Sequence, residues 1–116
     1  MKRILIVDDE QMLRECLRDL LSQRGCIVFE ASNGEEALKL LEVQSVDLIL
    51  TDVDMPVKNG LEFLKEFRQK NFTTPVAIMS GGNIIDDNML RLIGAFSFIP
   101  KPNLDLDLLL NYIAAA

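Results

Sequence analysis

The chain has 116 residues, 49% of them hydrophobic, with 12 basic and 18 acidic side chains and a formal net charge of −6. This length predicts one domain, residues 1–116, with enough apolar side chains for a core. The acidic balance argues against direct nucleic-acid binding, which depends on clustered Lys and Arg. No apolar run approaches the ~18 residues of a membrane span or the apolar segment of a secretory signal. We therefore expect a cytoplasmic protein that does not contact the membrane.

Histidine is absent and cysteine occurs twice. Without histidine the chain has no imidazole metal ligand, no Ser-His pair and no phosphohistidine, so any phosphoryl group must arrive from another molecule. Two cysteines do not make a disulfide framework. Cys16 falls on the apolar stripe of the segment 11–24, which predicts a buried free thiol.

Short apolar runs alternate with segments of helical period along the chain. Strands are predicted at 3–7, 26–31, 47–51, 76–79 and 96–100. Helices are predicted at 11–24, at 35–43, from Leu61 through Phe67, at 84–93 and at the C-terminal end. Gly25 is expected to follow the end of the first helix. Ser32 and Glu35 have capping-box spacing at the start of the second.

Strict alternation of strands and helices predicts a parallel sheet with helices on both faces. We expect a flavodoxin-like, doubly wound α/β fold with five strands in the order 2-1-3-4-5 and five helices. That order places the strands at 3–7, 47–51 and 76–79 in the centre. Ligands of such sheets bind just outside the carboxyl ends of the strands.

Polar side chains follow the apolar runs at these ends. Asp8 and Asp9 follow the first run, and Asp52 follows the third. Ser80 follows the fourth run and Lys101 the fifth. Each residue alone has an ordinary explanation as a cap, a turn residue or a solvated charge. Their coincidence at successive strand ends instead favours a site for a hard cation and a phosphoryl group.

The chemistry of these groups fits that site. Carboxylates are Mg²⁺ ligands, and three of them crowded together without a cation would repel one another. Asp52 can act as a nucleophile toward phosphorus. Ser80 supplies a hydroxyl donor and Lys101 a mobile positive charge for a phosphoryl oxygen. Asp54, in the following loop, has a simple alternative as an acid that faces water.

Several segments, none specific alone, occur in an order and spacing that is specific. They are residues 4–10, 33–38 and 47–52, Met55-Pro56, Gly60, Ser80, Gly94-Ala95 and Lys101-Pro102. In these segments the chain resembles the receiver domain of bacterial two-component response regulators, the chemotaxis-regulator-like family, over nearly its whole length.

The resemblance implies a role for each matching residue. Asp52 would be the phosphoacceptor. Asp9 and Asp52 would bind Mg²⁺ directly together with the backbone carbonyl of Asp54, and Asp8 would act directly or through water. Ser80 would be the switch hydroxyl, Lys101 the phosphate-binding lysine and Phe98 the switch aromatic. The partners would be a sensor histidine kinase or phosphotransfer protein and a downstream target protein. The domain would not be an enzyme beyond Mg²⁺-dependent self-phosphorylation and autodephosphorylation.

Three departures from the family pattern fall on the signalling side. Gly81-Gly82 follows Ser80, where the family usually has Ala. The interval from Ser80 to Lys101 is 21 positions (101 − 80), one shorter than is common. Position 98 is Phe, where Tyr is more frequent. These changes keep a phosphorylation-independent adaptor with the same fold as an alternative.

A second alternative is a phosphohydrolase of the haloacid dehalogenase type. Asp52-Val53-Asp54 fits the D-x-D signature of that family after an apolar strand. That motif normally opens the chain and the acidic pair comes late, whereas here Asp8-Asp9 comes first. The chain also lacks a segment for a substrate-binding cap.

Overall fold

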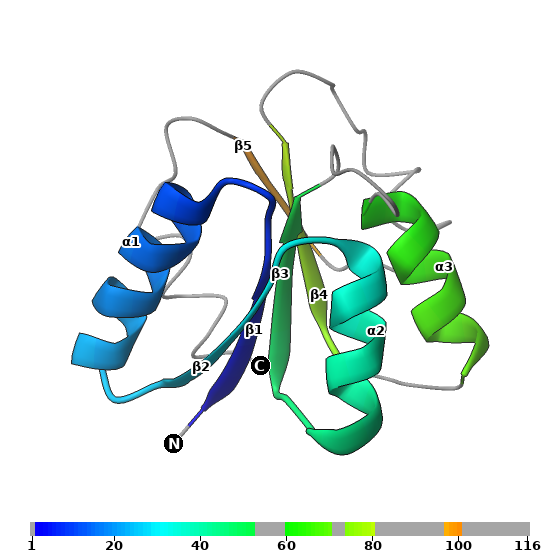
Figure 1. Cartoon of the computed structure of the whole chain (residues 1–116), viewed down its shortest axis with the longest axis horizontal. Coiled ribbons are helices and arrows are strands. Elements are labelled where there is room, and N and C mark those ends of the chain that lie inside the picture. The colour runs from blue at the N-terminus through cyan, green and yellow to red at the C-terminus, as the bar shows by residue number, and fades with distance from the viewer. Residues whose placement is uncertain (1, 53–59, 71–73, 81–96, 101–116) are drawn as a thin grey trace.

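The computed structural model describes residues 2–52, 60–70, 74–80 and 97–100, with the backbone alone described at 60, 61, 80 and 97–100. Strands and helices alternate through most of these residues (Figure 1). The strands are β1 (Arg3–Val7), β2 (Ile27–Ala31), β3 (Leu48–Asp52), β4 (Val76–Ser80) and β5 (Ser97–Pro100). The helices are α1 (Gln11–Gln23), α2 (Gly34–Val43) and α3 (Gly60–Gln69).

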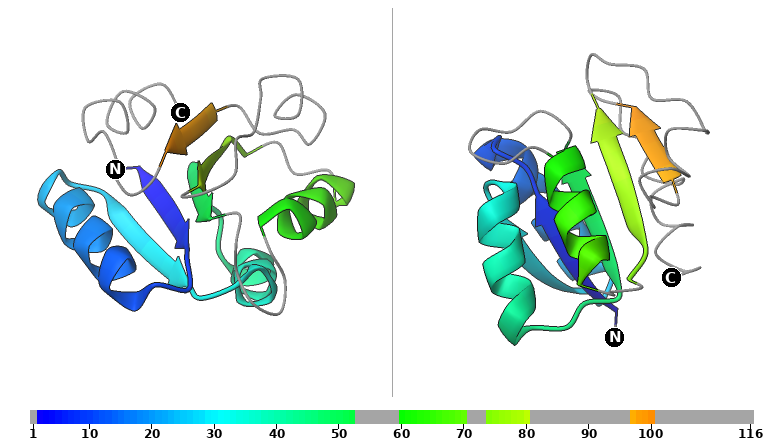
Figure 2. Two further views of the ribbon diagram at one scale, coloured as in Figure 1. Left: turned by 90° about the horizontal axis from the view of Figure 1, so that it is seen from above. Right: turned by 90° about the vertical axis from the view of Figure 1, so that its right-hand side faces the viewer.

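The five strands form one parallel sheet in the order β2-β1-β3-β4-β5. This confirms the predicted flavodoxin-like arrangement, and Figure 2 shows β4 and β5 side by side at one edge. Asp52 and Ser80 are the last residues of β3 and β4, one position further than the predicted strand ends. The predicted helices at 84–93 and at the C-terminal end lie outside the described residues.

Helices cover both faces of the sheet, with α1 on one side and α2 and α3 on the other (Figure 1). Alternate residues of each strand point to opposite faces, so every central strand serves two cores. The core under α1 contains Ile4, Ile6, Leu17, Leu21, Leu48, Leu50, Ala77 and Met79. The core under α2 and α3 contains Leu5, Val7, Ala31, Ala37, Leu38, Ile49, Phe63, Leu64, Phe67, Val76 and Ile78.

Helix α1 ends where the sequence predicted, in a Schellman motif around Gly25. The Cys26 N–H donates to the Leu21 carbonyl at 3.1 Å and the Gly25 N–H donates to the Ser22 carbonyl at 3.1 Å. Gly25 has φ = 84°, a left-handed conformation that glycine adopts without steric cost. The motif turns the chain directly into the edge strand β2.

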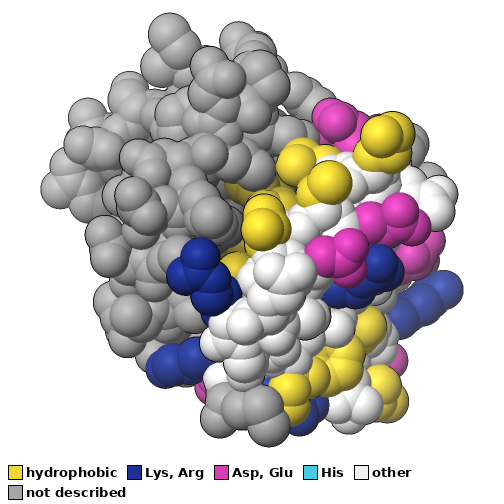
Figure 3. Space-filling view, turned by 90° about the vertical axis from the view of Figure 1, so that its left-hand side faces the viewer, with side chains coloured by type: hydrophobic (Ala, Val, Ile, Leu, Met, Phe, Trp, Pro, Cys, Tyr) yellow, Lys and Arg dark blue, Asp and Glu magenta, His cyan; other side chains and the backbone are white. Residues whose placement is uncertain are grey.

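Cys16 is exposed, so the prediction of a buried thiol is wrong. Two apolar rows run along α1 at a spacing of four residues. Leu17 and Leu21 face the sheet, whereas Met12 is 81% exposed and Leu20 is 39% exposed. Cys16 lies in the outer row, about 100° around the helix from the buried one. Figure 3 shows hydrophobic side chains beside acidic and basic ones on this side of the molecule.

The cap of α2 lies one residue later than predicted. Asn33, not Ser32, is the N-cap, and its Oδ1 accepts a hydrogen bond from the Glu36 N–H at 2.9 Å. The Glu36 carboxylate reaches back to the Ser32 hydroxyl at 2.6 Å and to the Ser32 N–H at 3.2 Å. Asn and Ser are comparable N-caps, so the sequence contained two candidate boxes one residue apart, and the extended backbone at Asn33 selects the second.

Candidate functional site

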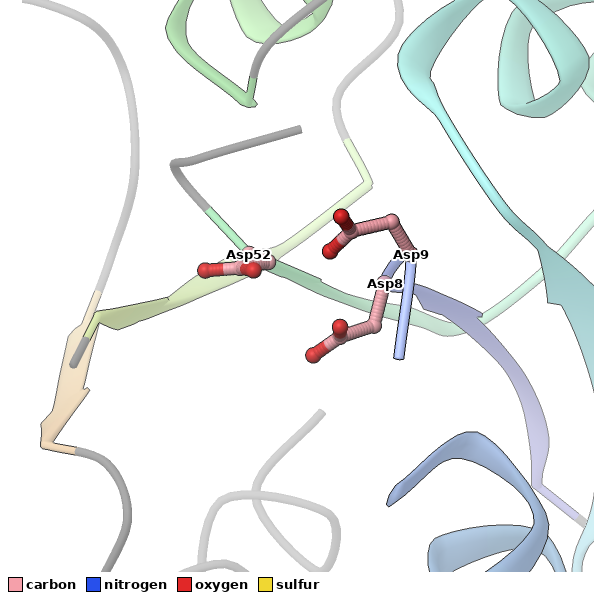
Figure 4. Close-up of side chains that lie close together, drawn as sticks. All are labelled: Asp8, Asp9 and Asp52. Carbon is pink, nitrogen blue, oxygen red and sulfur yellow. The ribbon is translucent and has the colours of Figure 1, made fainter. Parts of the chain in front are cut away.

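Three carboxylates meet at the carboxyl edge of the sheet. Asp8 and Asp9 come directly after β1, and Asp52 ends β3. Strands β1 and β3 are hydrogen-bonded neighbours with Val7 opposite Thr51, so the two strands bring their acidic residues to one place. One carboxylate oxygen of each residue lies within 4.8 Å of the others (Figure 4). The predicted convergence of Asp8, Asp9 and Asp52 is therefore what the structure shows.

The cluster combines buried and exposed acids. Asp8 is fully buried and Asp52 is 5% exposed, whereas Asp9 is open to solvent. Two unit charges ~5 Å apart repel by roughly 3 kcal/mol in an effective dielectric of about 20. A divalent cation would convert this repulsion into attraction, and clustered carboxylate oxygens are the ligands that Mg²⁺ prefers. The donor set therefore fits a hard cation with solvent access on the side of Asp9.

The loop between β1 and α1 is held from three directions. The Asp8 N–H donates to the Ala31 carbonyl of β2 at 3.0 Å. The Glu10 N–H donates to Asp8 Oδ1 at 2.9 Å, which fixes the carboxylate in a tight turn. Arg14 Nη1 donates to the Asp8 carbonyl at 2.7 Å. The backbone that carries Asp8 and Asp9 is therefore tied to the sheet and to the helix.

The contact of Arg14 with the acidic loop was not predicted from the sequence. Arg14 is one of several charged residues on an amphipathic helix, and its spacing from Asp8 matches no motif. A weak signal was available, since helical side chains point toward the N-terminus of their helix. A long side chain in the second turn of α1 can therefore reach back over the preceding loop.

Asp52 sits on a buried central strand. All five residues of β3 are buried, and the strand lies between β1 and β4. The Thr51 hydroxyl donates to the Asp52 carbonyl at 3.1 Å. A carboxylate on such a strand keeps its position relative to the Asp8-Asp9 loop, which favours a role as a fixed reaction centre.

The remaining predicted site residues are only partly within the described chain. The Ser80 backbone ends β4 beside β3 and opposite Pro100 of β5, which places Ser80 at the same edge as Asp52. The Ser80 side chain and the Phe98 side chain lie outside the described part. Asp54 and Lys101 lie wholly outside it. Their predicted roles stay predictions.

A cavity of about 340 Å³ lies at the other edge of the sheet, away from the carboxylates. It is lined by residues 41–46, Phe67 and Thr74, between the C-terminal ends of α2 and α3. Its lining mixes apolar side chains with one acid, Glu42, and no cluster of acids in the described residues adjoins it. This cavity is therefore separate from the carboxylate cluster.

None of the described helices is long and apolar enough to cross a membrane.

Comparison with known proteins identifies the family. The family model for the response regulator receiver domain matches residues 4–114. The transcriptional regulatory protein CpxR of Klebsiella pneumoniae is 43% identical over 108 residues, which are 93% of this chain and 46% of CpxR. The autoinducer sensor kinase/phosphatase CqsS of Vibrio cholerae is 39% identical over 98% of this chain and 17% of its own length. The chain thus spans less than half the length of these curated relatives.

Solved structures agree with the sequence comparison. The response regulator TrrA of Thermotoga maritima, crystallised with Mg²⁺ and beryllofluoride, has a TM-score of 0.87 and 32% identity. The match covers 99% of this chain and 98% of TrrA. Fold, family model and relatives all lead to one conclusion: this chain belongs to the family of response regulator receiver domains, the phosphoacceptor signalling modules of two-component systems.

Proposed function

We propose that Asp52 accepts a phosphoryl group from a phosphohistidine on a partner kinase or phosphotransfer protein, and that residues 1–116 act as one receiver domain. The observation that carries the proposal is the meeting of Asp8, Asp9 and Asp52 at the carboxyl edge, within 4.8 Å of one another. Family membership supports it, since receiver domains bind Mg²⁺ in an acidic pocket and act as signalling modules rather than as turnover enzymes.

The proposed reaction is an in-line transfer. An oxygen of the Asp52 carboxylate attacks phosphorus, a P–O bond forms, and the P–N bond to the donor imidazole breaks with its electron pair returning to nitrogen. Mg²⁺, held by the three carboxylates and the backbone carbonyl of Asp54, would neutralise charge on the phosphoryl oxygens. The buried position of Asp52 on β3 orients the attacking oxygen, and exposed Asp9 leaves the site open to a donor.

Ser80 and Lys101 complete the proposed set. The Ser80 hydroxyl would donate to a phosphoryl oxygen, and the Lys101 ammonium would pair with another. The Ser80 backbone at the end of β4, beside β3, supports this placement. Phe98 would respond to the movement of Ser80, and the surface formed by residues 84–100 and the C-terminal segment would then bind a downstream target protein.

The assignment of Asp52 is testable by mass. The protein is incubated with Mg²⁺ and a small phosphodonor such as acetyl phosphate, and intact mass is measured for wild type, Asp52→Ala and Asp19→Ala. We expect one phosphoryl group on wild type and on the Asp19→Ala control, whose acid is exposed on α1. We expect none on Asp52→Ala, and none on wild type with EDTA. An equal mass gain in Asp52→Ala would refute the assignment.

Lys101 has a separate test. Lys101→Ala should leave Mg²⁺ affinity within about twofold of wild type, because the ammonium serves the phosphoryl group and not the metal. The same variant should lose the change in amide hydrogen exchange that beryllofluoride causes at residues 80–100 in wild type. A variant that lost metal affinity but still responded would contradict this role. If wild type itself showed no response there, the phosphorylation-independent adaptor would be favoured.

The family comparison favours the receiver domain over the phosphohydrolase alternative. Its D-x-D signature requires Asp54 as the general acid, and Asp54 lies outside the described residues. The receiver family model covers the motif as well as the acidic pair at Asp8-Asp9. If the protein is a receiver domain and not a phosphohydrolase, it should not turn over a generic aryl phosphate in solution.

A further inference from the structure

One basic side chain lies against the backbone of the acidic loop. Arg14, in the second turn of α1, donates from Nη1 to the Asp8 carbonyl at 2.7 Å. Its side chain is only 15% exposed. A guanidinium is a planar, permanently charged donor, so it can hold a carbonyl in one place without a change of protonation near neutral pH.

A second residue, Glu30, contacts the Arg14 guanidinium at its Nε atom. Glu30 of β2 places Oε1 3.4 Å from Arg14 Nε, and its Oε2 accepts a hydrogen bond from Arg18 Nη1 at 3.1 Å. Arg14 Nε is enclosed and makes no hydrogen bond of good geometry with the described residues, so the 3.4 Å contact is an ion pair. Arg14 is therefore held between the loop carbonyl on one side and a carboxylate of the edge strand on the other.

The loop has reason to need this restraint. It carries Asp8 and Asp9, which face each other and Asp52 within 4.8 Å. Like charges at this distance push the loop away from β3. The N-cap residue of α1, Glu10, makes no side-chain capping hydrogen bond, and it is the Arg14 side chain that links the helix to the Asp8 carbonyl.

The pairing with Glu30 also reduces the effect of the Arg14 charge on cation binding at the carboxylate cluster. A lone guanidinium near the cluster would repel an incoming cation as well as attract the carboxylates. Glu30 offsets the charge of Arg14, and Arg18, which also pairs with Glu30, has a second carboxylate partner in Asp19. The main effect of Arg14 on the cluster is therefore its hydrogen bond to the Asp8 carbonyl, which fixes the position of the loop.

We propose that Arg14 is a positioning residue for the metal site, which holds the β1–α1 loop so that Asp8 and Asp9 are preorganised to bind Mg²⁺ with Asp52. The proposal rests on the proposed function, because it assigns the use of the same carboxylate cluster. It adds that the edge strand β2, through Glu30, belongs to the support of the site.

Calorimetric titration with MgCl₂ tests the inference on the full chain. Outer partners of metal ligands typically change metal affinity by about 10- to 100-fold, so we expect about tenfold weaker Mg²⁺ binding in Arg14→Gln. Arg14→Lys keeps the charge and one donor, so it should recover part of the affinity. Arg18→Gln is the matched control: it removes a guanidinium from the same Glu30 but not from Asp8, and should bind Mg²⁺ within about twofold of wild type.

A kinetic split separates positioning from general damage. The Mg²⁺ concentration for half-maximal phosphorylation should rise in Arg14→Gln, while the rate at saturating Mg²⁺ stays near that of wild type. Wild-type Mg²⁺ affinity in Arg14→Gln would overturn the proposal, and so would an equal loss of rate at low and saturating Mg²⁺. If Arg14→Gln does not fold, Arg14→Lys decides, and unchanged affinity in that variant overturns the proposal. Failure of the proposed function looks different: wild type would bind Mg²⁺ but gain no phosphoryl group on Asp52.

Discussion

At the amino edge of the sheet unlike groups are paired, whereas at the carboxyl edge three like charges are held together. Arg3 Nε donates to the Ser45 carbonyl at 2.7 Å, Nη2 donates to Gln44 Oε1 at 2.7 Å, and the guanidinium lies 5.0 Å from the ring centre of Phe29. The Arg3 N–H donates to Asp47 Oδ2 at 2.8 Å. These contacts pair donors with acceptors and stabilise the fold.

The carboxyl edge has the opposite character. Asp8, Asp9 and Asp52 approach one another within 4.8 Å, and two of the three are buried. Like charges this close repel one another, and a divalent cation would relieve that repulsion. In a parallel sheet the amino ends of all strands lie at one edge and the carboxyl ends at the other. One edge can therefore hold stabilising contacts while the other holds a cluster of acidic residues for a ligand.

Among the substitutions, the largest effect on stability is expected from one at the amino edge. Arg3→Ala removes two side-chain hydrogen bonds from a charged donor and the contact with Phe29, and should lower the free energy of unfolding by about 2 kcal/mol. Urea unfolding followed by circular dichroism measures it. Arg24→Ala, an exposed arginine at the end of α1, is the control and should change stability by less than about 0.5 kcal/mol. If both variants lowered the free energy of unfolding equally, the contacts of Arg3 would not be a specific source of stability at the amino edge.

A smaller loss is expected from a well-paired element at the carboxyl edge. Asn33→Ala leaves the Glu36 N–H without its side-chain acceptor at the start of α2, and should lower the free energy of unfolding by about 1 kcal/mol. Asn33→Ser retains an acceptor and should recover most of this loss. If Ser were as destabilising as Ala at this position, the cap would not be the cause.

The smallest expected effect is on the titration of Glu36. Hydrogen bonds, first from the Ser32 hydroxyl and then from the Ser32 N–H, lower the pKa of Glu36 below its ordinary value of 4.5. A lowered pKa in the folded state means that this carboxylate stabilises the fold above pH 4.5, and that the contribution is lost as the pH falls through the folded-state pKa. Ser32→Ala should therefore raise the pKa of Glu36, as measured by NMR titration. An unchanged value would assign the shift to other groups.

Strand positions and the meeting of the acids were predictable, because both follow from strong, local patterns. Apolar runs ending in Asp8 and Asp52 specify central strands, and parallel order then brings their ends together. The wrong prediction concerns which face of helix α1 is buried. Cys16 and Leu17 both belong to apolar rows, and only packing against the sheet decides which row is buried. Arg14 was missed for a related reason, since its function depends on a contact with a loop carbonyl that no side-chain pattern encodes.

The contrast between the edges has one direct test, the dependence of stability on Mg²⁺ in wild type and Asp9→Asn. Asp9 is exposed, so its conversion to Asn relieves repulsion with little loss of packing. In EDTA the variant should be more stable than wild type, by about 0.5 kcal/mol. Saturating Mg²⁺ should stabilise wild type by about 2.7 kcal/mol at a hundredfold excess over its dissociation constant, and should stabilise the variant less. The order of stability of the two proteins should therefore reverse when Mg²⁺ is added. A variant that is less stable than wild type in EDTA, or that gains as much from Mg²⁺, would contradict it.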